Sequence, residues 1–367
     1  MPLDKQRILV INPGSTSTKI AVYENESPLL TANIRHSDSD LAAFRDHSIL
    51  DQADFRREVI EAEIVRAGIG LSTLTAVAGR GGLLRPLPSG TYKVNQAMLE
   101  ELREARRGQH ASNLGAVIAY ELARRIGVDA YIVDPVSVDE WTDYARLSGS
   151  PLLERPCLSH ALNTKAVAKR YAAGHQKKYG DLRLIVAHLG SGISVSAHAV
   201  GRMIDVTNSR EEGAFSTERA GTVPAMKLVE LCFSGKYTAK QIETLLFREG
   251  GIQAYLGTKD LEEIESRIDA GDNRAVLVYR ALLYQIAKEI GAMATVLEGR
   301  VDAILLTGGM AKSMRLVVAL SHFIRWIAPI EVFPGEDELR ALAEGTLRVL
   351  RGEEEAQEIF EAVAVTV

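Results

Sequence analysis

The amino-acid sequence predicts an α/β protein made of two related halves. Short β-branched runs alternate with longer helical patterns, which is typical of α/β proteins rather than of β-sandwiches or helical bundles. A strand, a turn of small residues and a second strand follow one another twice, at residues 8–23 and at residues 182–198. This repeat indicates a duplicated topology with a cleft between the two copies. The length of 367 residues suits two domains of ordinary size.

The elements of the first half follow from residue type and spacing. Runs rich in Val, Ile and Tyr predict strands at Ile8–Asn12, Ile20–Tyr23 and Ala130–Val133. Apolar residues at helical spacing predict helices at Leu41–Arg66, Gln96–Arg107 and Asn113–Ile126.

The second half has the same alternation of strands and helices. Strands are predicted at Leu182–His188, Ile193–His198, Met203–Thr207, Ala303–Thr307 and Ile330–Phe333. Helices are predicted at Ala161–Tyr171, Ala225–Phe233, Ala239–Arg248, Leu261–Ala270, Asn273–Leu297, Ser313–Phe323 and Asp337–Arg351. The helix that begins at Asn273 is long and apolar on one face, as expected of a helix packed on a sheet.

We place the division between the halves near residues 155–161. Pro334 and Gly335 follow the strand at residues 330–333, and this break allows the last helix to return to the first domain. The expected domains are residues 1–160 together with about residues 340–367, and residues 161–339.

Composition excludes several classes of protein. The net charge of −5 argues against a general nucleic-acid binder, which needs a basic face, but leaves room for a small anionic ligand. No run of about 18 apolar residues predicts a membrane span. Cys157 and Cys232 match no metal or disulfide spacing, so reduced thiols in the cytoplasm are expected.

Three turns of small residues indicate a nucleotide site. Residues 12–19 are rich in Gly, Ser and Thr, and such a turn offers backbone N–H groups and hydroxyls to an anion. The P-loop pattern and the protein-kinase motifs are absent from the chain. One such hairpin alone would be read as a tight turn. A second turn at 190–192 and a third at 308–311, which follows a buried strand, favour a nucleotide spread over several turns.

Charged residues in the same kind of segment extend this site. Arg80 and Arg219 lie in short glycine-bearing stretches that can direct a cation to a ligand, although a solvated surface arginine is the alternative. Asp134 follows a buried strand, where carboxylates of α/β proteins often contact a metal or a ligand. The acidic residues 336–338 begin a helix, so interaction with the helix dipole also accounts for them.

In their order along the chain, these segments resemble butyrate kinases, a group of the acetate kinase family. The resemblance rests on eight blocks between Ile8 and about Arg351, namely residues 12–19 (NPGSTSTK), 79–86 (GRGGLLRP), 110–115 (HASNLG), 133–135 (VDP), 160–163 (HALN), 188–192 (HLGSG), 306–309 (LTGG) and 333–338 (FPGEDE). The family lies within the acetate and sugar kinase, heat-shock ATPase and actin superfamily. The resemblance implies two ribonuclease-H-like domains, with the acid on the side of the first and the nucleotide on the side of the second.

The same resemblance implies an activity, cofactors and partners. The expected reaction is reversible phosphoryl transfer between ATP and a short-chain carboxylate, giving an acyl phosphate and ADP, with Mg²⁺ in the cleft. A homodimer or higher homo-oligomer is also implied, without nucleic-acid or membrane partners.

The resemblance also assigns roles to individual residues. The catalytic residues would be Asn12, Arg80, His110, Asp134, His160 and Arg219. The nucleotide contacts would be Ser15, Thr16, Ser17, Lys19, His188, Gly190, Ser191, Gly192, Gly308, Gly309, Met310 and Ala311. Magnesium would be held by Asp134 and Glu338.

Two departures from the family pattern concern the nucleotide turn and the loop before Arg219. Ser191 stands where related kinases have Gly or Asn, and residues 208–218 form a segment that is one residue shorter and lacks the usual proline. Acetate, isobutyrate and other branched acids stay open as substrates, because one methylene gives only about 1–3 kcal/mol of discrimination. A nucleotide-binding regulator of the same fold is the alternative outside enzymes, although retention of both arginines argues against it.

Overall fold

The computed structural model describes residues 5–45 and 47–360, which divide into two compact units. The first unit comprises the described residues up to Asp139 and those from Asp337 onward, and the second comprises Glu140–Glu336. The chain therefore passes from the first unit to the second after Asp139 and returns to the first after Glu336. The sequence pattern had predicted the first of these divisions later in the chain, near residues 155–161.

The first unit is built on a six-stranded mixed sheet with the order β3-β2-β1-β4-β6-β5. β1, β2 and β3 pair antiparallel, β1, β4 and β6 pair parallel, and β5 is antiparallel to β6. Its strands are β1 (Arg7–Pro13), β2 (Ser17–Glu24), β3 (Ser27–Arg35), β4 (Ala76–Arg80), β5 (Thr91–Lys93) and β6 (Asp129–Val133). Its helices are α1 (Asp38–Ala42), α2 (Ala53–Arg66), α3 (Gln96–Glu104), α4 (Asn113–Ile126) and α13 (Glu338–Leu350).

The second unit is built on a five-stranded sheet with the order β11-β10-β7-β8-β9. β7, β8 and β9 pair antiparallel, whereas β7, β10 and β11 pair parallel. Its strands are β7 (Leu184–Leu189), β8 (Ile193–Ala199), β9 (Arg202–Val206), β10 (Ala303–Gly308) and β11 (Ile330–Pro334). Its helices are α5 (Asp143–Arg146), α6 (Ala161–Gly174), α7 (Ala225–Cys232), α8 (Ala239–Phe247), α9 (Gly251–Leu256), α10 (Leu261–Asp269), α11 (Asn273–Val296) and α12 (Met314–Ile324).

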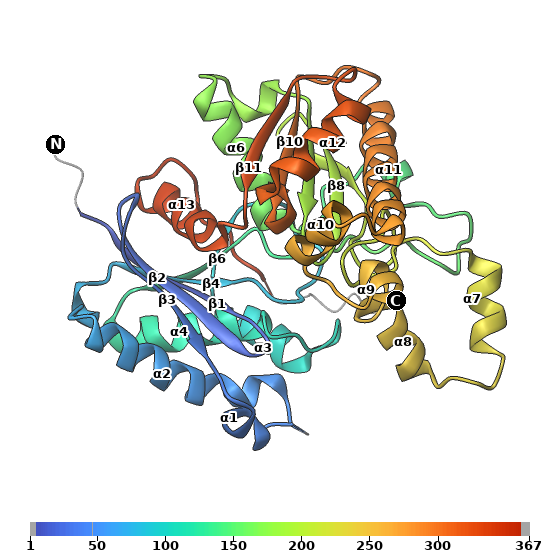
Figure 1. Cartoon of the computed structure of the whole chain (residues 1–367). Helices are drawn as coiled ribbons and strands as arrows, with labels where there is room; N and C mark the ends of the chain where they lie inside the picture. Colours follow the sequence, from blue (N-terminus) through green and yellow to red (C-terminus); the bar gives the residue numbers. More distant parts are fainter. Residues whose placement is uncertain (1–4, 46, 361–367) are drawn as a thin grey trace. The chain divides into compact units, whose positions relative to one another are not determined.

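Helices cover both faces of each sheet because successive strand residues point to opposite sides. In the first unit, α4 packs on one face while α13 packs on the other, where Gly345 lies against Val133 (Figure 1). In the second unit, Ile185 packs with α11 and α12, whereas its neighbour Leu184 packs with α6. The resulting cores are the two large apolar clusters that hold each sheet in place.

The two sheets share one topology. Each begins with an antiparallel three-stranded meander, and its first strand then pairs in parallel with two later strands, which gives β3-β2-β1-β4-β6 and β9-β8-β7-β10-β11. This is the ribonuclease-H-like arrangement, present twice in one chain. The predicted α/β fold with two domains of duplicated topology is confirmed.

Two predictions about elements of the first unit differ from the structure. The single helix predicted at residues 41–66 is wrong, because α1 ends at Ala42 and α2 begins at Ala53. A 3₁₀ turn at Ile49–Gln52 precedes α2, and Ser48 caps this turn by accepting a hydrogen bond from Leu50 N. The strands β3, β4 and β5 were not predicted, since β3 alternates exposed residues at the sheet edge, β4 is largely Ala and Gly, and β5 has only three residues.

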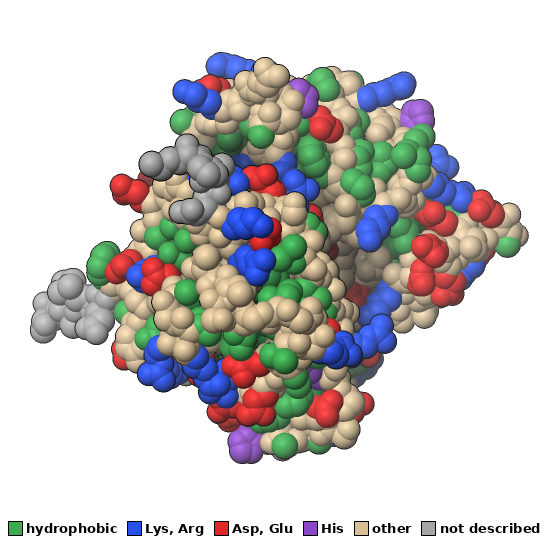
Figure 2. All heavy atoms as spheres, turned by 90° about the vertical axis from the view of Figure 1, so that its left-hand side faces the viewer, with side chains coloured by type: hydrophobic (Ala, Val, Ile, Leu, Met, Phe, Trp, Pro, Cys, Tyr) green, Lys and Arg blue, Asp and Glu red, His purple; other side chains and the backbone are tan. Residues whose placement is uncertain are grey.

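The surface carries charges of both signs. On the face shown in Figure 2, Lys and Arg side chains are interspersed with Asp and Glu side chains. That face has no continuous basic stripe of the kind that follows a nucleic-acid backbone. Of the helices in the described part of the chain, none is long and apolar enough to cross a membrane.

A buried polar network crosses the second unit. Lys165 is 1% exposed and donates to Glu140 Oε2 at 2.6 Å. His198 is fully buried, with its Nδ1 2.6 Å from Tyr179 Oη and its Nε2 2.8 Å from Ser196 Oγ. Burial, with a smaller contribution from the Lys165 charge, lowers the pKa of His198 to about 3. The folded protein therefore keeps this imidazole neutral.

The neutral His198 makes stability depend on pH. Below its ordinary pKa of 6.5, the unfolded chain binds a proton that the folded chain does not bind. We expect His198 to reduce the free energy of unfolding by up to about 1.4 kcal/mol for each pH unit between about 6.5 and 3. Urea unfolding of the protein and of His198→Gln between pH 7 and 4.5 measures this contribution, because the variant should show a shallower slope. The same change at the exposed His47 is the control, and equal slopes for all three proteins would contradict the prediction.

Candidate active site

The turn between β1 and β2 directs its backbone carbonyls into the first unit. Gly14 N donates to Ser17 O at 2.7 Å, and His36 N donates to Thr16 O at 2.9 Å. Arg56 donates to the carbonyls of residues 14, 15 and 17. Among the described residues, the N–H groups of Ser15 and Thr16 find no acceptor. A turn with its carbonyls held inward and its amides free suits an anion.

Two polar side chains of the first unit donate to one carboxylate oxygen of a third. Asn12 Nδ2 donates to Glu338 Oε2 at 2.6 Å, and Arg80 Nη1 donates to the same oxygen at 2.8 Å. Arg80 Nη1 also lies 3.3 Å from Asn12 Oδ1. Asn12 is the last residue but one of β1 and Arg80 ends β4, so the parallel pairing of these strands brings both side chains to the carboxyl edge of the sheet. Glu338 is the first residue of α13.

Two glycines fix the position of Arg80. A Cβ on Gly79 would lie 2.0 Å from Gly115 O, and a Cβ on Gly115 would lie 2.3 Å from Arg80 O. Helix α4 therefore contacts strand β4 backbone to backbone, which only glycine allows at these positions. The close contact sets the point from which the Arg80 side chain leaves the sheet.

Two carboxylates of the first unit have the chemistry to bind a divalent cation. Asp134 follows β6 with a φ of 39°, an uncommon conformation for a residue other than glycine. Its Oδ1 accepts hydrogen bonds from Ser89 Oγ at 2.6 Å and from Gly90 N at 2.9 Å, whereas Oδ2 has no hydrogen-bond partner among the described residues. Glu338 likewise accepts hydrogen bonds only at Oε2, and its Oε1 has no hydrogen-bond partner among the described residues.

This pair of carboxylates fits magnesium better than a metal enclosed by protein ligands. The described part of the chain contains no group of three or more His, Cys, Asp or Glu side chains that could hold a metal. Mg²⁺ is usually bound by one or two carboxylates together with water and phosphate oxygens. Asp134 and Glu338 each keep one carboxylate oxygen of the kind that can bind a magnesium ion whose other ligands are water and phosphate.

The second unit gathers polar side chains at the matching edge of its own sheet. His188 in β7 is 1% exposed, and its Nδ1 accepts a hydrogen bond from Asn163 Nδ2 at 2.9 Å. Its Nε2 then carries the proton and lies 3.1 Å from Glu336 Oε1. His160 stacks on His188 with ring centroids 3.9 Å apart. Asn163 also donates to Thr307 Oγ1 at 3.1 Å, which links α6 to the end of β10.

Arg219 lies directly against the glycine turn after β7. A Cβ on Gly192 would lie 2.5 Å from Arg219 Nη1, so the guanidinium occupies the space beside this glycine. Arg219 donates to Ser209 O at 3.0 Å and to Ser209 Oγ at 3.2 Å. Burial lowers the pKa of Arg219, with a smaller effect from the charge of Arg210.

The loop before Arg219 is fixed to the same turn. Ser216 Oγ donates to Ser191 O and accepts a hydrogen bond from Arg219 N at 3.0 Å. Asn208 Nδ2 donates to Pro156 O at 3.1 Å. The short segment at residues 208–218 thus joins Arg219 to Ser191, so the two departures from the family pattern are in contact.

The third predicted turn follows β10. Gly308 has a φ of 94°, and a Cβ there would lie 2.4 Å from Leu189 O, so a side chain is excluded at this position. Gly308 N and Gly335 N each donate to the carbonyl of the other glycine. Met310 and Ala311 are 6% and 3% exposed, so contacts from these residues to a ligand would come from the backbone.

The remaining predicted residues belong to the first unit. The Nδ1 atom of His110 is 2.8 Å from Ser112 Oγ, at the start of α4. Lys19 is exposed on β2, where it pairs in register with Asn12. Ser15 and Thr16 are exposed in the first turn.

Several residues of these clusters were not predicted as site residues. Asn163 and Thr307 lie in the blocks at residues 160–163 and 306–309, which was a usable signal. Arg56 and Ser216 make their contacts across the chain, and nothing in their local sequence distinguishes them. Glu336 was interpreted as a helix-start residue, although its position just after β11, at the carboxyl edge of a parallel strand, was a usable signal.

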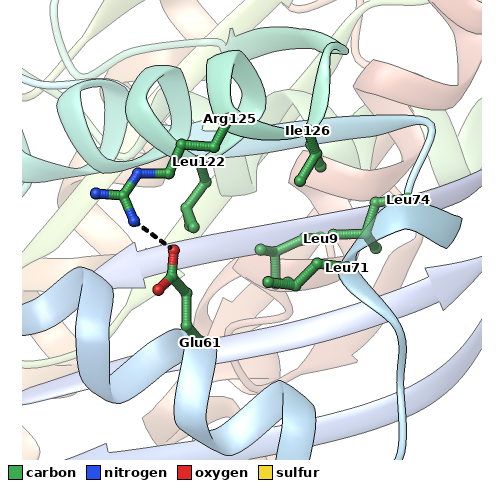
Figure 3. A pocket seen from close by; sticks show the side chains of 7 residues that line it. All are labelled: Leu9, Glu61, Leu71, Leu74, Leu122, Arg125 and Ile126. Carbon is green, nitrogen blue, oxygen red and sulfur yellow. Dashed lines mark hydrogen bonds and ion pairs between the residues drawn. The ribbon is translucent and has the colours of Figure 1, made fainter.

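A separate apolar pocket of about 260 Å³ lies in the first unit between α2 and α4 (Figure 3). Five aliphatic side chains line it, and Arg125 Nη1 lies 3.3 Å from Glu61 Oε1 beside them. Leu9 reaches this pocket from the first half of β1, whereas Asn12 lies near the end of that strand. None of the predicted site residues lines the pocket.

Comparison with known proteins is consistent with these clusters. Residues 157–327 match the acetokinase family, and this segment includes His160, His188 and Arg219. The match also covers the turns at 190–192 and 308–311.

Solved structures extend the likeness to both units. Acetate kinase from Porphyromonas gingivalis has a TM-score of 0.78 at 20% identity, covering 94% of this chain and 100% of that one. A propionate kinase from Francisella tularensis gives 0.75 at 18% identity, with 92% and 98% covered. Acetate kinase from Entamoeba histolytica gives 0.74 at 14% identity, with 93% and 99% covered. At these identities the likeness shows a shared fold.

Proposed function

We propose that this chain, which matches the acetokinase family over residues 157–327, is an ATP-dependent kinase of short-chain carboxylates. The observation that carries the proposal is the cluster of Asn12, Arg80 and Glu338 beside a turn with free amides. A cation, an amide and a carboxylate next to an anion turn suit phosphoryl transfer, which depends on positioning and charge neutralisation.

The acceptor chemistry explains why the site needs no general base. A carboxylate is already ionised at pH 7, so it can attack phosphorus directly, in contrast to the hydroxyl of a sugar. The new O–P bond forms on the acid while the bond to the leaving ADP oxygen breaks, and no proton moves. The reverse reaction, from acyl phosphate and ADP, uses the same groups.

Each cluster has a defined task in this proposal. Arg80 and Arg219 would neutralise charge on the carboxylate and on the moving phosphoryl group, as arginines do in other phosphoryl transfers. His188 would donate from Nε2 to a phosphate oxygen in place of Glu336 Oε1, since its Nδ1 is occupied by Asn163. The turns at 190–192 and 308–311 would supply backbone N–H groups to the nucleotide.

Magnesium belongs to the proposal as a cofactor. Asp134 and Glu338 would hold it through their free oxygens, and when bound it screens the negative charge of the nucleotide phosphates. Glu338 would then contact Arg80, Asn12 and the metal at the same time. These contacts would hold the two side chains at fixed positions relative to the metal.

We propose butyrate as the preferred acid, with acetate and isobutyrate as the competing substrates. Hydroxylamine trapping of the acyl phosphate, with ATP, Mg²⁺ and acids from acetate to valerate, measures the preference directly. We expect kcat/KM to be highest for butyrate and to fall about 10-fold or more for acetate, because two fewer methylenes are buried.

Other outcomes of this assay would distinguish the alternatives. A maximum at isobutyrate or acetate would change the substrate within the same activity. ATP binding without hydroxamate from any acid would overturn the kinase proposal in favour of a nucleotide-binding regulator.

A further inference from the structure

The structure buries one guanidinium beneath the first turn. Arg56 lies in the first part of α2 and is 0% exposed. Its Nε and Nη2 donate to Gln52 Oε1 at 3.0 and 2.8 Å, and its remaining hydrogen bonds go to the turn. Burial lowers the pKa of Arg56 to about 10, so the group is still charged at pH 7.

No negative group in the described residues neutralises this charge. All the acceptors of Arg56 are neutral, namely Gln52 Oε1, Thr18 Oγ1 and the carbonyls of residues 14, 15 and 17. The nearby His36 shares Thr18 Oγ1 at 2.9 Å, and burial, followed by the charge of Arg56, lowers its pKa. A buried cation is costly unless an anion accompanies it. The neighbouring Arg57, by contrast, pairs with Asp54 and Glu121.

The geometry of the turn shows what the guanidinium does. Arg56 Nη1 lies 2.9 Å from Gly14 O and 3.1 Å from Ser17 O, while Nη2 lies 3.2 Å from Ser15 O. These bonds hold the carbonyls away from the side on which the amides of Ser15 and Thr16 are free. Only a planar fork with several donors can reach so many acceptors at once.

We propose that Arg56 is a positioning residue that holds residues 14–18 in their anion-binding form, and that ligand phosphate supplies its missing counter-charge. This inference rests on the proposed function, together with the contacts to ATP that the family resemblance implies for Ser15, Thr16 and Ser17 of this turn. Arg56 does not touch the ligand. It acts by fixing the carbonyls of the turn, and its positive charge attracts the phosphate electrostatically across the turn.

The proposal predicts a loss of affinity that is specific to phosphate. Arg56→Met removes the charge and all the donors, and we expect Mg-ATP affinity to fall about 10- to 100-fold. Affinity for adenosine, which has no phosphate, should change less than about twofold. Arg56→Lys should recover part of the loss, because it restores the charge without the fork. Titration calorimetry with Mg-ATP and with adenosine measures both affinities.

Arg57→Met is the matched control. Arg57 is also buried in α2, but its partners are carboxylates and it makes no contact with the turn. Its loss should lower thermal stability as Arg56→Met does and leave Mg-ATP affinity unchanged. If Arg56→Met does not fold, Gln52→Leu serves instead, since it keeps the charge but removes the acceptor that orients Arg56. That variant should weaken Mg-ATP binding about threefold or more while adenosine binding is retained.

The outcomes separate this inference from the proposed function. If the parent protein phosphorylates a short-chain acid and the Arg56 and Gln52 variants bind Mg-ATP as Arg57→Met does, the inference fails alone. Equal losses for Mg-ATP and adenosine would also overturn it, because they indicate a general structural role. If the parent protein does not bind Mg-ATP, the proposed function fails and the inference fails with it.

Discussion

Replacing Arg219 with alanine should lower the turnover of acyl phosphate formation by about 10³-fold, the scale of a cation that stabilises a phosphoryl transition state. The reason is that the guanidinium lies beside Gly192 in the proposed phosphate turn, held by the backbone and hydroxyl of Ser209. Arg80→Ala should have an effect of similar size, although it also frees Glu338 and Asn12 from a hydrogen bond. Steady-state kinetics with saturating Mg-ATP measures both losses.

Lysine at either position should recover only part of the activity. An ammonium group keeps the charge but cannot make the planar two-pronged contact with a carboxylate or phosphoryl group. Arg210→Ala is a suitable control, because Arg210 is in the same loop but its side chain pairs with Glu243 on the surface. A turnover of Arg219→Ala within about threefold of the parent protein would reject the catalytic role of Arg219. It would also mean that the short loop at residues 208–218 does not deliver a working cation.

The same substitution in two helices should have opposite effects on stability. Gly115 lies within α4, where a Cβ would lie 2.3 Å from Arg80 O, so Gly115→Ala must push the helix from the strand. We expect a loss of about 3 kcal/mol in the free energy of unfolding, at the upper end of the usual range for overpacking. Gly291 lies within α11, where a Cβ would have no atom within 4 Å. Gly291→Ala should therefore add about 0.5–1 kcal/mol, because alanine favours the helix.

Urea unfolding of the two variants tests this pair of predictions. Gly115→Ala should also lower turnover, since the shifted backbone belongs to Arg80, whereas Gly291→Ala should keep the parent activity. Equal stability changes in the two variants would show that the contact between α4 and β4 can relax at little cost. In that case the close approach would not be what positions Arg80.

The sequence predicted which candidate site residues lie at or just after buried strands, and the structure confirms these positions in each sheet. Asn12, Asp134, His188 and Gly308 each come at or just after a run of β-branched or apolar residues, and the carboxyl ends of parallel strands collect at one edge. Their partners could not be predicted in this way. Glu338 is 326 residues from Asn12 along the chain, and only the return of α13 to the first sheet brings them together.

Arg56 illustrates a second reason why local sequence patterns fail to predict some residues of the candidate site. An arginine four residues after a glutamine in a helical segment is typical of a solvated face, yet here both side chains are buried. Their burial depends on the path of residues 14–18, which a helix pattern does not contain. The residues that hold a turn from behind are therefore harder to predict than those that line it.

The return of α13 to the first sheet also affects how the protein folds during its synthesis on the ribosome. Glu140–Glu336 is one uninterrupted stretch, so the second unit can complete its fold during synthesis before α13 has left the ribosome. Until then, one face of the first sheet lacks its covering helix, and Asn12 and Arg80 lack Glu338. A nascent chain that stalls before this helix exposes an apolar face to chaperones. It also lacks the assembled cluster of Asn12, Arg80 and Glu338, so under the proposed function an unfinished chain would not consume ATP.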